Sequence, residues 1–222
     1  MKVGMPSSLS QLSMSLAMIF LNFVVLRTGG DYGMAVFASG WRIVMIGAVP
    51  VMGMAAAVTS VVGAAYGARD AAKLEDAYTY AIKIGVIMEM IIGFLIYIFA
   101  PQITYIFTYS ESSVDLSPGI VEFLRTIVFF FPVIPFGMFT SSMFQGSGMG
   151  MRSLAVTVLR TLGFQVVFAY LLGIVLQYGL QGVWIGIVAG NMITAIITFV
   201  WGRFTVKHLK KEWYADTAAN AG

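Results

Sequence analysis

Long apolar runs separated by short polar breaks make up almost the whole chain. The longest run, Met34 to Tyr66, carries one charge, Arg42, and one proline, Pro50. As a helix it would extend about 50 Å, whereas the hydrocarbon layer of a bilayer is roughly 30 Å thick. We expect it to tilt or to bend at Pro50, because proline has no N–H to donate to the preceding turn. Soluble domains do not bury such a run, so the pattern predicts a membrane protein.

The same pattern predicts six membrane-spanning helices and therefore an all-α polytopic membrane protein. Polar or glycine-rich breaks separate the runs at Arg27–Gly33, Gly67–Asp70, Thr108–Pro118 and Gly146–Arg152, and Pro132 and Pro135 interrupt the fourth helix. The expected spans are residues 6–27, 34–66, 79–100, 119–145, 153–176 and 182–204. These spans form one lobe, residues 1–206, and residues 207–222 form a basic polar tail.

The distribution of lysine and arginine predicts how the lobe is oriented. Six crossings put both termini and the second and fourth connections on one side. That side holds Lys2, Arg69, Lys73, Arg152, Arg203, Lys207, Lys210 and Lys211. The other side holds Arg27, or Arg27 and Arg125 on a wider count. Because basic residues favour the cytoplasmic side, we expect both termini in the cytoplasm and a multi-pass protein of the cell membrane.

Composition narrows the function classes. Charged residues make up 10% of the chain, against about 25% in soluble domains, and cysteine is absent. The single histidine, His208, lies in the tail, where a solvated role is expected rather than a metal site. Neither a phosphate-binding loop nor a nucleophile–base pair is found, so we predict no enzymatic activity and no cofactor. The net charge of +3 lies at membrane edges and does not indicate nucleic-acid binding.

Polar residues inside the spans are the candidates for substrate binding. Gln11, Ser15 and Asn22 share one face of the first helix with Met18, and in a bilayer that face must turn toward protein or water. Ser141 and Gln145 precede the break at Gly146. We expect these five polar residues to line a pocket formed by the first, second and fourth helices. The 15 methionines and 17 phenylalanines suit an adaptable apolar pocket, but they equally suit any membrane core.

Charges within the spans are the candidates for ion coupling. Glu89 lies well inside the third span, where an ionised carboxylate is costly unless it is paired or reached by water. It is either a proton- or cation-coupling acid or a carboxyl held by a hydroxyl or arginine of a neighbouring helix, and both interpretations stay open. For Arg42 and Arg160 we favour side chains that reach back to the membrane surface.

Glycines at intervals of four suggest close helix packing. Gly182, Gly186 and Gly190 form such a stripe on the last helix, and Gly63 and Gly67 repeat the spacing at the end of the second. Small residues let helix backbones approach closely in a membrane. We favour simple packing over the alternative of a sliding surface.

Four segments resemble the multidrug and toxic compound extrusion (MATE) family. The opening GMPSSLSQLSMSL is similar to the start of that family's seventh helix, and three later segments follow in the family's order: GAAYGARDAAKLEDAYTYA, SSMFQGSGMGMRSLAVTVLR and GLQGVWIGIVAGN. The resemblance covers Gly4 to about Phe204 and corresponds to the carboxy-terminal six-helix half. It implies a transporter that exports organic, often cationic, compounds in exchange for protons or sodium. It also implies two six-helix lobes with the substrate between them.

The chain departs from the family pattern in three respects. It contains one lobe, and the acid that proton-coupled members carry on their first helix would lie in the other half. The acid that sodium-coupled members carry in the seventh helix is missing, since this face offers Gln11, Ser15 and Asn22. A proline common in the eleventh helix is absent between Leu162 and Tyr170.

Three interpretations follow. The first is a half-transporter that needs a second six-helix lobe, either an amino-terminal half or another copy. The second is a transport-inactive membrane subunit or truncated remnant. The third, an intramembrane enzyme, is disfavoured because paired catalytic groups are lacking.

Overall fold

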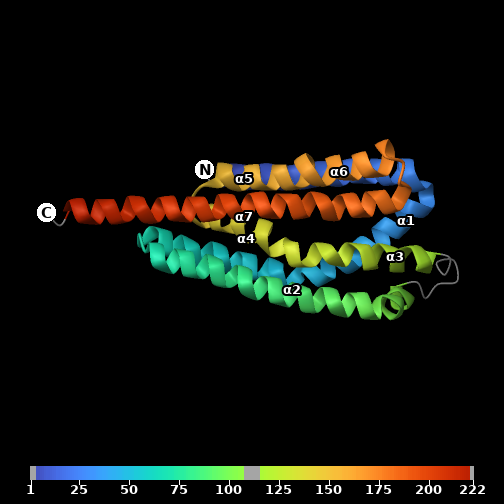
Figure 1. Ribbon diagram of the computed structural model, residues 1–222, viewed down its shortest axis with the longest axis horizontal. Coiled ribbons are helices and arrows are strands. Elements are labelled where there is room, and N and C mark those ends of the chain that lie inside the picture. Colours follow the sequence, from blue (N-terminus) through green and yellow to red (C-terminus); the bar gives the residue numbers. More distant parts are fainter. Residues whose placement is uncertain (1–3, 108–115, 221–222) are drawn as a thin grey trace.

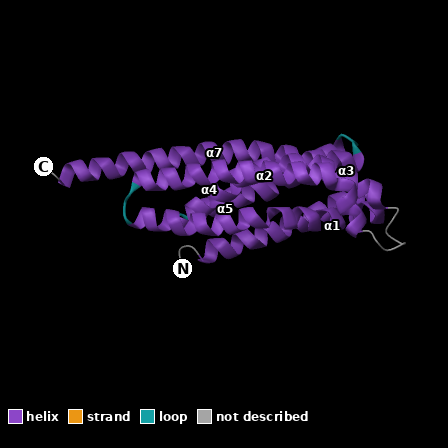
Figure 2. Ribbon diagram, turned by 90° about the horizontal axis from the view of Figure 1, so that it is seen from below, coloured by secondary structure: helices purple, strands orange, loops and turns teal. Residues whose placement is uncertain are grey.

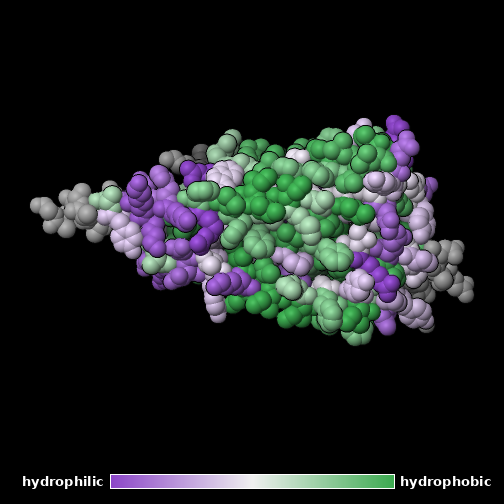
Figure 3. All heavy atoms as spheres, viewed as in Figure 1, coloured by the Kyte–Doolittle hydropathy of each residue, from purple (hydrophilic) through white to green (hydrophobic). Residues whose placement is uncertain are grey.

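The computed structural model describes residues 4–107 and 116–220, and the regular structure in this part of the chain is helical. Helices run side by side along the long axis (Figures 1 and 2). Five of the described helices are long and apolar enough to cross a membrane. Figure 3 shows an apolar band between two polar ends. Large apolar side chains such as Phe94 and Ile196 are exposed. The chain is thus an all-helical, multi-pass membrane protein.

Helix α1 (Gly4–Gly67) covers the first two predicted spans. Its backbone leaves the helical region only at Gly30, with φ 56° and ψ −150°, a conformation that costs glycine little. The two halves run in opposite directions on either side of this residue (Figure 1). α1 therefore consists of two helices that meet at Gly30, inside the predicted connection Arg27–Gly33. Pro50 keeps helical backbone angles, so no such break occurs there.

The third and fourth predicted helices follow as α2 and a helix in three parts. Helix α2 (Ala71–Phe107) contains both the charged interfacial start and the third span. Most of the predicted polar loop, residues 108–115, lies outside the described residues. Helix α3 (Ser117–Ile127), the 3₁₀ segment η2 (Val128–Val133) and α4 (Ile134–Gly146) then form the fourth helix. The 3₁₀ segment contains Pro132 and ends just before Pro135, as expected because two backbone donors are missing there.

The fifth predicted helix is distorted in a way that its sequence did not indicate. It consists of α5 (Gly150–Val158), the π-helical segment η3 (Leu159–Val166), α6 (Val167–Tyr170) and a second π-helical segment, η4 (Leu171–Val175). Helix α7 (Gly179–Asn220) completes the chain and continues through most of the residues predicted as a tail. In the polar part of α7, Arg203 and Lys210 form ion pairs with Glu75 of α2. The nitrogen–oxygen distances are 3.4 Å for Arg203 and 3.0 Å for Lys210.

Close backbone packing holds α7 against the distorted fifth helix. A methyl group added at Gly186 would lie 2.5 Å from the carbonyl oxygen of Phe168, and one at Gly190 would lie 2.7 Å from that of Phe164. Gly63 likewise approaches the carbonyl oxygen of Gly146. The predicted packing role is confirmed for the stripe on α7 and for Gly63, whereas a methyl group added at Gly67 would meet no atom within 4 Å. The start of α1 and the far end of α7 lie toward the same end of the bundle (Figure 1).

Candidate functional site

A pocket of about 230 Å³ lies between both halves of α1, the η2–α4 segment and η3. Most of its lining is apolar, including Trp41 and Phe130. Five of the lining residues are methionines: Met14, Met18, Met45, Met52 and Met138. Methionine side chains are flexible and polarisable, so the pocket can repack around apolar groups of different shape. The first, second and fourth predicted helices thus meet around a pocket as expected, with the fifth helix as an additional wall.

All three polar residues of the lining come from η3. Thr161 and Gln165 are buried, and Arg160 is half-buried. The Thr161 hydroxyl donates to the carbonyl oxygen of Thr157 at 2.8 Å. The Cδ atom of Arg160 passes close to Gly137, where a methyl group would lie 3.2 Å away. None of the lining residues carries a carboxylate.

The predicted polar face of the first helix lies beside this pocket rather than in it. Gln11 and Ser15 are exposed and Asn22 is half-buried, and the Ser15 hydroxyl donates to the carbonyl oxygen of Gln11 at 3.1 Å. Their neighbours Met14 and Met18 line the pocket. The three polar side chains therefore lie on the surface of the lobe.

Ser141 and Gln145 belong to a separate polar cluster between α4 and α5. The hydroxyl oxygens of Ser141 and Ser153 are 2.7 Å apart, and the Gln145 Nε2 donates to the Ser153 hydroxyl at 3.0 Å. Ser141 and Gln145 are half-buried, and neither lines the methionine-rich pocket. In this conformation they join the two helices close to the turn that follows Gly146.

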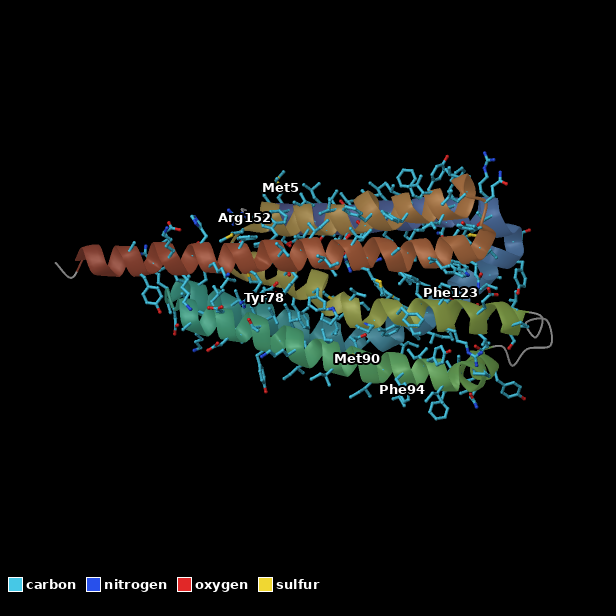
Figure 4. The ribbon with its side chains drawn as sticks, in the orientation of Figure 1. Met5, Tyr78, Met90, Phe94, Phe123 and Arg152 are labelled. Carbon is cyan, nitrogen blue, oxygen red and sulfur yellow. The ribbon has the colours of Figure 1, made fainter. Side chains whose placement is uncertain are left out.

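Glu89 is completely buried in α2, and neither carboxyl oxygen has a hydrogen-bond partner among the described residues. One turn away on each side, Gly85 packs against Phe139 and Pro135, and Gly93 packs against Phe131. Met90 and Phe94, on another face of α2, point away from the bundle (Figure 4). The carboxyl group is therefore on the side of α2 that faces η2 and α4, next to the proline break.

Sequence reasoning missed Arg160, Thr161 and Gln165 as pocket residues. Arg160 was expected to extend to the membrane surface, whereas the structure places it in the pocket lining. The available signal was the spacing of three polar residues within an apolar run. A regular helix puts Thr161 and Gln165, four residues apart, on one face, but it turns Arg160 well away from Gln165. The π-helical hydrogen bonding of η3 changes that relation.

Comparisons with known proteins identify a family and its architecture. The family model MatE matches residues 6–171. A crystal structure of MATE in complex with MaL6 is similar, with a TM-score of 0.91 and 56% identity, and the match covers 95% of this chain and 47% of that one. The inward-facing conformation of a multidrug resistance MATE family transporter matches with a TM-score of 0.89 and 56% identity, over 94% and 47% of the two chains.

A MOP superfamily transporter from Pyrococcus furiosus matches with a TM-score of 0.90 and 55% identity, over 94% of this chain and 46% of that one. The chain thus spans about half the length of the solved structures that it matches. No curated protein matches it.

Proposed function

The chain belongs to the MatE family, and on that premise we propose that it is one lobe of a secondary transporter that exports organic, often cationic, compounds in exchange for protons or sodium ions. Each half of α1 crosses the cell membrane once, which gives six crossings and two cytoplasmic termini. A second six-helix lobe completes the transporter. Substrate is held between the lobes and released by alternating access.

The methionine-rich pocket is the observation that carries this proposal. A multidrug transporter must accept different apolar bodies, and flexible methionine side chains suit that task. Next to the pocket, Gln11, Ser15 and Asn22 form a polar surface that is costly against lipid. A second lobe would cover this surface and extend the pocket into a larger cavity. Ser141 and Gln145 would supply further polar lining if their hydrogen bonds with Ser153 are replaced by hydrogen bonds with the substrate.

Glu89 is the proposed coupling group. A fully buried carboxyl group without a hydrogen-bond partner is stable only when it is neutral or when a small cation lies beside it. Binding and release of a proton or a sodium ion at this carboxyl would change how α2 packs against the proline break. That packing change is the means by which ion exchange could drive the lobe between conformations.

The mass of the purified protein in detergent tests the need for a second lobe. We would measure it for the chain alone and after co-expression with the six-helix amino-terminal half of a MATE transporter. A dimer, or a stable complex that exports substrate from proteoliposomes, is the expected result. Gln11→Leu combined with Ser15→Leu should weaken that association, whereas Phe94→Leu, on an outward-facing side of α2, should leave it unchanged. A monomer that forms no complex would instead favour the transport-inactive subunit or remnant.

A further inference from the structure

We infer that the methionine-rich pocket binds compounds that carry an anionic group on an apolar body, with Arg160 as the residue that holds the anion. The inference rests on the proposed transport function for its biological meaning, and it names anions as the substrate class of this pocket, in place of the often cationic compounds that the family resemblance implies. The binding itself can be measured in the isolated chain.

The charge of the pocket is the first argument. Arg160 is the one charged residue in the lining, and arginine stays protonated in proteins. It lies about 10 Å along the helix from residue 153, where the expected span begins, and therefore inside a roughly 30 Å hydrocarbon layer. Charges at that depth are normally paired, yet Arg160 forms no ion pair with any described residue. An anionic ligand would supply the missing partner, whereas a cation would meet a like charge.

The chemistry around Arg160 is the second argument. A guanidinium group is a planar fork that can donate two parallel hydrogen bonds to a carboxylate, sulfonate or phosphate. The buried amide of Gln165 adds a donor on the same wall. Trp41, Phe130 and the methionines line the rest of the pocket and would contact an apolar body. The lining thus offers one anion-binding end and one apolar end.

The local backbone is the third argument and is independent of charge. Every polar residue of the pocket lies in η3, a π-helical segment, and such segments are found frequently at functional sites. Gly137 on the facing helix leaves space beside the Arg160 side chain, since a methyl group there would approach its Cδ atom to 3.2 Å. The π-helical backbone and the space at Gly137 together place the Arg160 guanidinium group at the wall of the pocket, and not buried between η3 and α4.

Trp41 provides a direct readout, because it lines the pocket and bromine quenches tryptophan fluorescence on contact. The chain would be placed in phosphatidylcholine nanodiscs and titrated with 4-bromobenzoate and with (4-bromophenyl)trimethylammonium, which share one apolar body and differ in charge. We expect the carboxylate to bind at least tenfold more tightly than the ammonium compound. The other tryptophans also contribute to the fluorescence. Trp41→Phe should therefore remove the saturable part of the quenching, which comes from Trp41, and leave only the quenching of the other tryptophans.

Two substitutions separate charge from fold. Arg160→Gln should abolish the preference for the carboxylate, and Arg160→Lys should keep a preference of reduced size. Arg42→Gln is the matched control, because Arg42 is also an intramembrane arginine, next to Trp41, but is exposed and absent from the lining. It should leave the preference unchanged. Equal or tighter binding of the ammonium compound to the wild type would overturn the inference. So would a preference that Arg160→Gln leaves intact.

A lipid phosphate and a free organic anion share the same chemistry, and a change of lipid distinguishes them. If phosphatidylglycerol weakens 4-bromobenzoate binding in a manner that depends on Arg160, the natural occupant is a lipid headgroup. If phosphatidylglycerol leaves the affinity for 4-bromobenzoate unchanged, the natural occupant is a free anion. Both results support an anion site. Failure to export substrate with a second lobe would refute the proposed function but would leave this binding result standing.

Discussion

Two ionisable side chains inside the lobe, Glu89 and Arg160, lie in opposite settings. Glu89 is completely buried on α2, with no hydrogen-bond partner for its carboxyl oxygens among the described residues. Arg160 is half-buried on η3 and lines a pocket. A group enclosed by packed side chains can exchange only a proton or a small ion, whereas a group that lines a pocket can bind an organic ligand. We therefore propose that ion coupling and ligand recognition belong to different parts of one lobe.

The helix broken by Pro132 and Pro135 lies between the two groups. Phe130, Ile134 and Met138 line the pocket. The adjacent stripe, which includes Phe131 and Phe139, packs against the glycines that flank Glu89. A helix that lacks two backbone donors is easier to bend at that point. It therefore provides a physical connection through which a change at Glu89 could alter the pocket.

The largest effect should follow from Glu89→Gln, which keeps the shape of the side chain but cannot ionise. If Glu89 is the coupling group, this change abolishes the pH dependence of transport or ligand binding, because no group remains to exchange the ion. Transport by proteoliposomes that contain both lobes would be measured across a series of external pH values. Glu122→Gln is the control, because Glu122 is an exposed acid of α3 that does not line the methionine-rich pocket. Unchanged pH dependence in Glu89→Gln would exclude the coupling role.

Methionine substitutions compare the cost of burying each charge. Glu89→Met should stabilise the lobe by about 1–3 kcal/mol, because it replaces an unpartnered buried polar group with an apolar side chain of similar size. Arg160→Met should change stability less, since the guanidinium group borders a pocket and is already partly accessible. Unfolding by SDS titration in mixed micelles would measure both. A large destabilisation by Glu89→Met would show that its carboxyl has a partner.

Two glycines test how tightly Glu89 is enclosed. A methyl group at Gly85 would lie 2.5 Å from the ring of Phe139, whereas at Gly93 the nearest atoms are 3.4 Å away. We expect Gly85→Ala to cost about 1–3 kcal/mol through overpacking against a buried ring. Gly93→Ala should be neutral or stabilise α2 by up to about 1 kcal/mol, because alanine favours helix. Equal changes in stability for the two variants, measured by the same SDS titration, would show that α2 is packed equally tightly on both sides of Glu89.

The smallest effect concerns paired charges at the polar end. Glu75 pairs with Arg203 and Lys210, and all three side chains are partly exposed. Glu75→Gln should cost about 0.2–1 kcal/mol, as is usual for exposed ion pairs, and less at high salt because of screening. Unfolding would be compared at low and high salt. A cost that is insensitive to salt would point to packing rather than charge.

The apolar pattern predicted most of the fold because helix length, proline and glycine act locally. It located the proline break in the fourth helix and the close packing at Gly63 and Gly186, and it identified Glu89 as an acid within a span. It also located the break between the two helices of α1, but not that a single residue, Gly30, makes this turn, since such a turn depends on one residue's backbone angles.

The candidate site was less predictable because it depends on which faces of the helices meet. The polar residues Gln11 and Ser15 were expected in the pocket, but of that face only Met18 lines it, together with Met14 on the adjacent stripe. Arg160 was missed for a related reason, as the π-helical bonding of η3 alters which residues share a face. Analysis of sequence periodicity assumes a regular α-helix, so it cannot predict which residues share a face in a π-helical segment.

The most direct test of the separation between Glu89 and Arg160 is one quenching titration of Trp41 with 4-bromobenzoate in three proteins: the wild type, Glu89→Gln and Arg160→Gln. At a constant acidic pH, where the Glu89 carboxyl is neutral like the amide of glutamine, we predict that Arg160→Gln weakens binding at least tenfold and that Glu89→Gln stays within about twofold of the wild type. A tenfold change corresponds to about 1.4 kcal/mol. If Glu89→Gln weakens binding as much as Arg160→Gln, or if Arg160→Gln binds normally, the two charges do not have separate roles.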